Sequence, residues 1–282
     1  MTAGGAHRPH VLPHLIDLTD EQFEAYERRM VALRTRELER YPALADGDFG
    51  LAHLQHIHAH LTADIYDFAG RIREPGQDTH ALGIEHCPPE LLPQVLPELF
   101  ADIAGTRPDP TDRGRALYTT AEHWAALSWA HPMLDGNSRT QRVFFTRYLN
   151  DAGWDIDWRA VDADAVHAAR HASFLTEDPS WLAAQLRPGL VEAGEHAEHT
   201  LAATTGQRHE QRPVEIFTAM LEHHAAGGDG ETYTHPDQPH PPTPHDPTPP
   251  ATPTIDADRA PSSRPRPPEP PPPPAPQPRP HL

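Results

Sequence analysis

The chain has 282 residues, a formal net charge of −18 at pH 7 and 23 Lys or Arg positions, all of which are Arg. This charge argues against general binding to nucleic acid or to an anionic membrane. The lack of lysine excludes a Walker A loop, the strand Lys of protein kinases and Schiff-base chemistry. The single cysteine, Cys87, excludes an internal disulfide and a cysteine-rich metal site. Because no apolar run reaches the roughly 18 residues of a membrane span and no apolar leader follows Met1, we expect a cytoplasmic protein that does not enter a membrane.

Two amphipathic helices are predicted before residue 70. The first begins at a capping box, Thr19 to Gln22, in which the Thr and Gln side chains each accept a backbone N–H of the other residue. Its apolar face carries Phe23, Tyr26, Met30 and Leu33. The second is indicated by helical spacing of Leu51, Leu54, Ile57, Leu61 and Ile65.

The segment from Arg71 to Cys87 is an unusual insert between helices. It contains Gly76 and Gly83 and few apolar residues. Loops held on a rigid scaffold often carry function, although a plain surface loop is the simpler interpretation.

Further helices are predicted along the rest of the chain. A third begins at Pro88 and Pro89 and is expected to be shortened or kinked by later prolines. The other helical stretches are 119–130, 139–149 with Gly153 as its terminator, 166–172, 181–186 and, as a peripheral segment, much of 194–226. The expected fold class is therefore all-α, with one core in about 180 residues.

Four regions are expected along the chain. They are an N-terminal extension at 1–15, a helical domain at 16–195, a peripheral helical segment at 196–230 and a Pro-rich tail at 231–282. The tail holds 21 of the 35 prolines and lacks apolar periodicity, so we expect it to be disordered. It serves either as a solvated spacer or as a docking segment with PxxP spacings.

The chemistry is concentrated between residues 131 and 142, which read His-Pro-Met-Leu-Asp-Gly-Asn-Ser-Arg-Thr-Gln-Arg. His131 stands where one helix ends, and a short loop leads into the N-terminus of the next helix, which attracts anions. Two guanidiniums near that N-terminus suit phosphate oxygens. These features predict a site for a polyphosphate.

This stretch resembles the signature of the Fic family, His-x-Phe-x-(Asp/Glu)-Gly-Asn-Gly-Arg-x-x-Arg. Six of its eight defined positions match, and Met133 and Ser138 depart from it. The segments Ile65–Gly70, Pro88–Glu90 and Leu99–Phe100 also resemble the family, so that the similarity covers roughly residues 15–195.

The resemblance implies a helical Fic domain that moves AMP from ATP, with Mg²⁺, to a hydroxyl side chain of a target protein. His131 would be the general base and Asp135 the Mg²⁺ ligand. The residues implied to bind the nucleotide are Gly136, Asn137, Ser138, Arg139 and Arg142. The segment 71–87 would form the family's flap hairpin, with Arg71, Ile72, Arg73, Ile84 and Glu85 as its target-docking residues.

Ser138 leaves alternatives open. Its Cβ and its lack of glycine's backbone freedom are expected to narrow the phosphate site. The domain then transfers another group, such as a phosphoryl group or UMP, or acts as an inactive docking module.

Regulation and partners are also implied by the resemblance. Fic enzymes are commonly restrained by a Ser/Thr-x-x-x-Glu-(Gly/Asn) helix that masks the last motif Arg, and no complete copy occurs here. The partial copies are Thr35 with Glu39, Ser173 with Glu177 and Thr218 with Glu222. Arg142 is therefore expected to be unmasked, and a small antitoxin-like inhibitor to act in trans. The family suggests DNA gyrase or topoisomerase IV as the target.

The run His56-x-His58-x-His60 invites a metal interpretation. Only His56 and His60 share a helix face there, with Asp64 as the sole carboxylate that continues it. We therefore expect no metal at these histidines.

Overall fold

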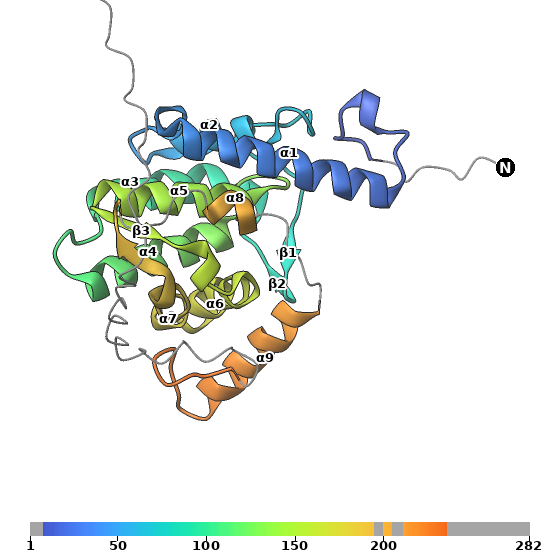
Figure 1. The fold of residues 1–282 in the computed structure, drawn as a ribbon. Helices are drawn as coiled ribbons and strands as arrows, with labels where there is room; N and C mark the ends of the chain where they lie inside the picture. The colour runs from blue at the N-terminus through green and yellow to red at the C-terminus, as the bar shows by residue number, and fades with distance from the viewer. Residues whose placement is uncertain (1–7, 195–199, 205–210, 236–282) are drawn as a thin grey trace, which may run out of the picture. The chain divides into compact units, whose positions relative to one another are not determined.

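The structure is a computed structural model that describes residues 8–194, 200–204 and 211–235 (Figure 1). Its α-helices are α1 (Asp20–Arg40), α2 (Leu51–Thr62), α3 (Leu92–Gly105), α4 (Arg113–Ala130), α5 (Asn137–Asp151), α6 (Ala163–Thr176), α7 (Ser180–Leu186), α8 (Thr200–Thr204) and α9 (Arg212–Ala225). The strands are β1 (His80–Ala81), β2 (Ile84–Glu85), β3 (Trp154–Ile156) and β4 (Leu190–Glu192). The all-α class is confirmed, and none of the described helices is both long and apolar enough to cross a bilayer.

Helix α1 begins at the predicted capping box. The Thr19 hydroxyl accepts the N–H of Gln22 at 3.2 Å, and the Gln22 side chain accepts the N–H of Thr19 at 2.9 Å. Such caps stabilise a helix start by about 1 kcal/mol. The box fixes where α1 begins and thus which of its residues face the domain.

Helices α4 and α5 form the centre of the domain and flank the 131–142 motif. The Trp124 ring of α4 stacks on Phe145 of α5, with 5.0 Å between ring centroids. The Gln141 side chain joins the helices, because its oxygen accepts from Trp124 Nε1 at 3.1 Å and its nitrogen donates to the Leu127 carbonyl at 3.1 Å. Gln141 is buried, and a satisfied buried amide holds one relative position of two helices. The end of α4 and the start of α5 are therefore rigidly placed.

Helix α4 is longer than predicted. It begins at Arg113, where the Asp112 side chain caps it by accepting the N–H of Arg115 at 3.0 Å. The prediction began at Thr119 because the first turns carry Gly114 and charged residues that hide the apolar period.

Helix α9 belongs to the core, so the prediction of a peripheral segment is wrong for this helix. Ile216, Phe217 and Met220 are buried in the main core cluster, and α9 packs on α6. Figure 1 shows α1 and α9 at opposite ends of the domain.

The first residues of the Pro-rich region are also placed on the domain. Tyr233 lies 5.7 Å from the Trp181 ring, and Glu231 forms an ion pair with Arg187. Residues 231–235 thus contradict the prediction that disorder begins at residue 231. The rest of the expected tail, 236–282, lies outside the described residues.

The expected N-terminal extension packs as well, within its described part. Val11 pairs with Tyr66 in an isolated β-bridge, and both residues join Leu15 and Ile65 in a second buried cluster. Residues 8–15 therefore brace the segment that follows α2.

Two small antiparallel sheets complete the description. The β1–β2 hairpin pairs His80 with Glu85 and Ala81 with Ile84, as expected for a flap. The second sheet, β3–β4, was not predicted. Its strands have three residues each and lie far apart in the chain, so no local sequence pattern predicts their pairing.

Candidate active site

The motif forms a tight connection between α4 and α5. His131 ends α4 in the left-handed region, with φ 43° and ψ 58°, and Gly136 precedes α5 with φ 76°. A Cβ at Gly136 would lie 3.1 Å from the His58 ring, so both conformation and space require glycine there. The first N–H groups of α5 have no partner inside the helix, which makes its N-terminus a site for anions.

Asn137 braces this loop through its side chain. Its amide oxygen accepts the N–H of Met133 at 3.0 Å, and its nitrogen donates to the Met133 carbonyl at 2.7 Å. Asn137 is buried, and Met133 lies fully in the core where the family signature has Phe. The side chain of Asn137 thus holds the loop in place through both its oxygen and its nitrogen.

His58 of α2 holds the other side of the loop. Its Nε2 donates to the Asp135 carbonyl at 2.9 Å, and its Nδ1 accepts the N–H of Gly70 at 2.8 Å. Burial lowers the pKa of His58, which keeps the ring neutral, and the Gly70 N–H that donates to Nδ1 leaves the ring proton on Nε2. His58 therefore links α2 to the motif as a structural residue.

Arg73 has a structural role, which corrects its assignment to target docking. Its side chain is buried and donates to the backbone carbonyls of His131 at 2.7 Å, of Ala130 at 3.1 Å and of Cys87. Burial also lowers its pKa. A guanidinium that satisfies the carbonyls at the end of α4 fixes the backbone of His131 and is not available to a target.

The other expected docking residues lie at the flap. Ile84 and Glu85 form β2, and Leu82 and Gly83 make the hairpin turn with positive φ values of 54° and 78°. Arg71 is exposed and lies 3.6 Å from Asp67, whereas Ile72 and Ile84 pack partly against the core. The hairpin thus has the shape for adding a target strand, and docking itself stays a prediction.

The partly buried His131 ring lies among other nitrogen groups. The His86 ring stacks on it with centroids 3.7 Å apart and planes 6° apart, and His171 of α6 lies 5.8 Å from His86. Burial, together with His86, Arg170, His171 and Arg73, lowers the pKa of His131 well below its usual value. The ring is therefore neutral near pH 7 and has a lone pair for a proton.

Asp135 and Arg139 are linked by hydrogen bonds and an ion pair with two residues from outside the motif. The Tyr66 hydroxyl lies 3.2 Å from the Asp135 carboxylate and 3.0 Å from the Glu27 carboxylate, so the two carboxylates share its single proton as acceptors. Glu27 of α1 in turn forms an ion pair with Arg139. Burial and the Asp135 and Glu27 charges raise the pKa of Tyr66, so its hydroxyl remains a donor. Arg139 is thus paired with a carboxylate in the protein without a ligand.

Arg142 is engaged within the chain, which corrects the expectation that it is unmasked. Its guanidinium lies 4.2 Å above the Trp158 ring and donates to the Thr204 hydroxyl at 2.7 Å. Burial lowers its pKa to about 10, and the Glu39 charge opposes that shift. Of the three partial inhibitory pairs, only Thr35 with Glu39 therefore has its Glu near Arg142.

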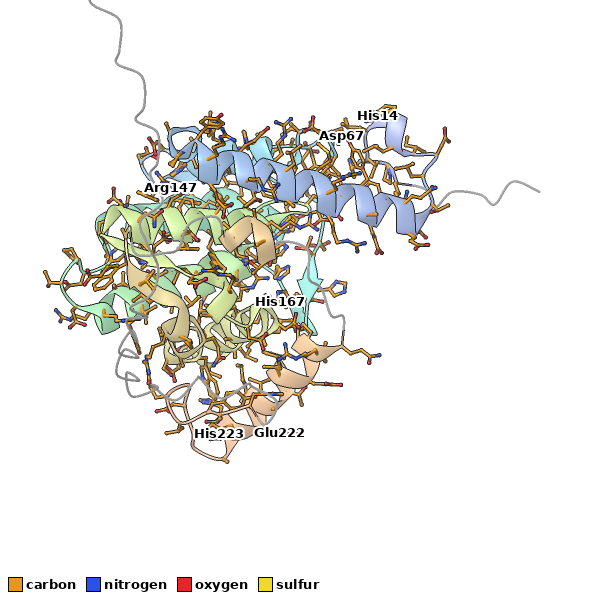
Figure 2. All side chains as sticks on the ribbon, in the orientation of Figure 1. His14, Asp67, Arg147, His167, Glu222 and His223 are labelled. Carbon is orange, nitrogen blue, oxygen red and sulfur yellow. The ribbon has the colours of Figure 1, made fainter. Side chains whose placement is uncertain are left out.

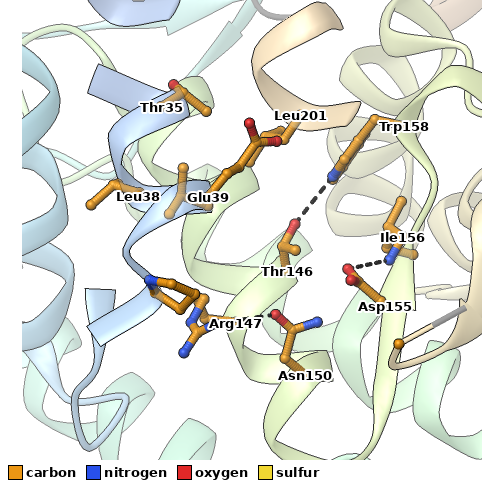
Figure 3. A pocket seen from close by; sticks show the side chains of 13 residues that line it. Thr35, Leu38, Glu39, Thr146, Arg147, Asn150, Asp155, Ile156, Trp158 and Leu201 are labelled. Carbon is orange, nitrogen blue, oxygen red and sulfur yellow. Dashed lines mark hydrogen bonds between the residues drawn. The ribbon is translucent and has the colours of Figure 1, made fainter. Parts of the chain in front are cut away.

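A cavity of about 250 Å³ lies beside this arrangement (Figure 3). Figure 3 shows Glu39 of α1, Leu201 of α8 and Trp158 around it, and Trp158 donates to the Thr146 hydroxyl at 3.2 Å. The cavity is thus bounded by the same Glu39 and Trp158 that lie near Arg142.

Ser138 lies in the first turn of α5, in helical conformation. The left-handed positions of the motif are His131 and Gly136, so the expected cost of lost glycine freedom at Ser138 is wrong. The other expectation, that the Ser138 side chain narrows the space at the start of α5, stays a prediction.

The donors present fit a single Mg²⁺ held jointly with phosphates. Asp135 is exposed and offers one carboxylate near the N-terminus of α5. Mg²⁺ commonly binds one or two carboxylates, several waters and substrate phosphates. Among the described residues, no group of three or more His, Cys, Asp or Glu side chains is arranged to hold a metal by itself.

Sequence reasoning missed His86, His171, Tyr66 and Glu27 as parts of the site. For Glu27 a signal exists, because it lies four residues after Phe23 and so shares the apolar face of α1. A carboxylate on an apolar face predicts a buried partner. His86 and His171 carry no comparable signal, since they come from separate elements.

Comparison with known proteins places this arrangement in a family. The Fic/DOC family model matches residues 48–149. The probable protein adenylyltransferase y4lH of Sinorhizobium fredii is 30% identical over 183 residues, which cover 63% of this chain and 90% of that protein. Protein adenylyltransferase VbhT of Bartonella schoenbuchensis is 28% identical over 64% of this chain, but only 37% of VbhT is covered.

Solved structures agree at the level of the fold. The BepC effector protein of Bartonella tribocorum with bound AMPPNP has a TM-score of 0.56 and 16% identity, and the match covers 62% of this chain and 90% of that one. The matched family model includes the whole of the 131–142 motif, and the described helices reproduce the Fic fold. The chain therefore belongs to the Fic/DOC family.

Proposed function

We propose that the protein transfers the AMP moiety of ATP to a Ser, Thr or Tyr hydroxyl of a second protein. One observation carries the proposal: a neutral imidazole, His131, ends α4 beside the N-terminus of α5, where the loop also places the Asp135 carboxylate. The names of the relatives, which are protein adenylyltransferases, support the same reaction. The AMPPNP bound to BepC supports ATP as the donor.

In the proposed reaction, the target hydroxyl oxygen attacks the α-phosphorus of ATP. The hydroxyl proton passes to a ring nitrogen of His131, and the bond from the α-phosphorus to the oxygen that bridges the α- and β-phosphates breaks. Pyrophosphate leaves with that oxygen, and AMP stays on the target as a phosphodiester. A triphosphate beside the ring adds negative charge and raises the pKa of His131, which makes it a stronger base when substrate is bound.

The nucleotide is proposed to lie along the start of α5. The N–H groups after Gly136 face the α-phosphate region, and Arg139 and Arg142 hold the β- and γ-phosphates. Asp135 would hold Mg²⁺, which would neutralise part of the phosphate charge. Binding then requires Arg139 to exchange Glu27 for phosphate, and Arg142 to turn from Thr204.

The target and the control of the reaction are proposed from family resemblance. The flap hairpin would hold an extended target segment, with DNA gyrase and topoisomerase IV as first candidates. A cytoplasmic toxin of this kind would be restrained in trans by a small antitoxin-like protein, in addition to the contacts of Arg142. Expression of the chain alone should then slow growth, and His131→Ala at equal protein level should not.

Calorimetry with ATP and Mg²⁺ separates this function from its alternatives. Binding together with AMP transfer supports the proposal. Binding without AMP transfer supports another transferred group, such as a phosphoryl group or UMP. No binding at millimolar ATP supports an inactive docking module and overturns the proposal.

A further inference from the structure

The flap and the proposed catalytic base are in direct contact. His86 is the first residue after β2, and its ring lies parallel to the His131 ring, with 3.7 Å between centroids and 6° between planes. The plane of the His131 ring is thus defined by a flap side chain, while its backbone is held by Arg73 at the other end of the flap.

His86 is itself held in place. Its Nδ1 lies 2.9 Å from the Thr79 hydroxyl, and its backbone N–H donates to the Thr79 carbonyl at 3.1 Å. Because Thr79 precedes β1, these bonds close the base of the hairpin. The ring therefore moves only if the hairpin moves.

The second nitrogen of His86 gains nothing for folding. His86 Nε2 is buried without a hydrogen-bond partner among the described residues, as is His171 Nε2. A buried polar atom left unpaired costs about 1–3 kcal/mol. A hydrocarbon ring of similar shape would avoid that cost but would lose the bond between Nδ1 and the Thr79 hydroxyl, so the two effects on stability oppose each other.

We propose that His86 is a positioning residue that fixes the ring plane of His131 and keeps water from its face. The inference rests on the proposed function, because it assigns a role toward the proposed base. An extended target segment that pairs with the hairpin would contact the same hairpin that holds His86. Target docking and alignment of the base are thereby coupled.

Other groups face His131 besides His86. They are Arg73 at the start of the flap and Arg170 and His171 on α6, and each lowers the pKa of His131 in addition to the effect of burial. Arg170 donates to Nδ1 of His167, the α6 residue that Figure 2 labels, at 2.6 Å. These groups remain in a His86 variant, and Phe and Leu at position 86 both lose the bond to the Thr79 hydroxyl, so the difference between these two variants reports the effect of the stacked ring.

The test compares two apolar replacements. His86→Phe keeps a flat ring on His131, and His86→Leu fills similar space without one. We expect His86→Leu to lower kcat for AMP transfer by about 10-fold to 100-fold, the scale on which misplaced groups lose rate. ATP affinity should be unchanged, and His86→Phe should retain most of the parental rate.

A second readout does not depend on activity. The ring signals of His131, identified by their loss in His131→Ala, are titrated by NMR in the full chain without nucleotide. We expect the His131 pKa to rise in His86→Leu, because a branched side chain covers the face of the ring less completely than a stacked ring does, and to stay low in His86→Phe.

The two readouts separate failure of the inference from failure of the proposed function. Without AMP transfer in the parent, the proposed function fails and the titration still tests the stack. The inference is overturned if His86→Leu has the same His131 pKa and the same rate of AMP transfer as the parent. It is also overturned by a folded His86→Phe as impaired as His86→Leu, since the imidazole nitrogen and not the stacked ring would then matter.

Discussion

The guanidinium of Arg139 on α5 forms an ion pair with the carboxylate of Glu27 on α1, 112 residues earlier in the chain. Both side chains are largely buried, with 13% and 10% of their surfaces exposed. Helix α1 thus supplies the counter-charge of a motif residue before any nucleotide is bound. This contact makes the stability of the free protein and the charge balance around Arg139 interdependent.

Glu27→Ala should reduce the free energy of unfolding by about 3–5 kcal/mol, because it leaves a buried guanidinium without its partner. Chemical denaturation measures this loss, and ATP with Mg²⁺ should restore part of it by supplying negative charge to Arg139. The matched control is Glu24→Ala on the same helix, whose pair with Arg28 is exposed. Its effect should stay below about 1 kcal/mol. Equal losses in the two variants would contradict the account of Arg139.

Asp135→Ala should weaken nucleotide binding and its dependence on Mg²⁺ together. Its carboxylate is exposed and can act as a metal ligand, whereas its backbone carbonyl accepts a hydrogen bond from His58. Calorimetric titrations of ATP at several Mg²⁺ concentrations measure both effects. If the mutant and the parent give the same Mg²⁺ curve, Asp135 is only a turn residue.

Ser138→Gly should raise the rate of AMP transfer. The residue lies in the first helical turn of α5, so its replacement changes clearance for phosphate and not backbone strain. Ser138→Ala, which keeps the Cβ and removes only the hydroxyl, should give an intermediate rate. Initial rates of AMP transfer are measured with labelled ATP for the parent and both variants. A rate for Ser138→Gly at or below that of the parent would show that Ser138 suits the present donor.

The free energy of unfolding should fall as the pH is lowered below about 6.5. Burial lowers the pKa of His86 to about 4 and that of His171 to about 3, and it lowers that of His131 as well. The unfolded chain, with histidine pKa values near 6.5, then binds protons that the folded chain does not, so stability rises with pH across this window.

Each such histidine should contribute up to about 2 kcal/mol of this loss between pH 6.5 and about pH 5. Urea denaturation at several pH values measures the slope. His171→Leu should make the slope shallower, whereas a matched change at the exposed His14 should not. A slope that is unaffected by His171→Leu would mean that this ring is not buried in its neutral form.

The helices were largely predictable, because capping and apolar spacing are local. The capping box at Thr19 set the start of α1 correctly, and the helix predicted over 139–149 begins only two residues earlier in the structure, at Asn137. Helix α9 was misjudged because its burial against α6 depends on a contact between distant segments. The β3–β4 pairing escaped prediction for the same reason.

The site was predictable in its motif and not in its surroundings. The order of residues 131–142 predicted the loop between two helices, and the roles of His131 as a base and of the helix start as a phosphate site stay predictions. The motif could not show that Arg73 donates to the last carbonyls of α4, or that the Thr204 hydroxyl accepts from the guanidinium of Arg142. Those partners come from elements 57 or more residues away, and only the folded chain brings them together.

The most direct test of AMP transfer uses ATP labelled at the α-phosphate and, in parallel, at the γ-phosphate. Cell lysate is incubated with the purified full chain or its His131→Ala variant, and labelled proteins are separated by size. We predict a band labelled from the α-phosphate and not from the γ-phosphate, reduced by about 10²-fold to 10⁴-fold in His131→Ala, with ATP binding retained. Labelling from the γ-phosphate, or equal α-phosphate labelling by the parent and His131→Ala, would contradict the account.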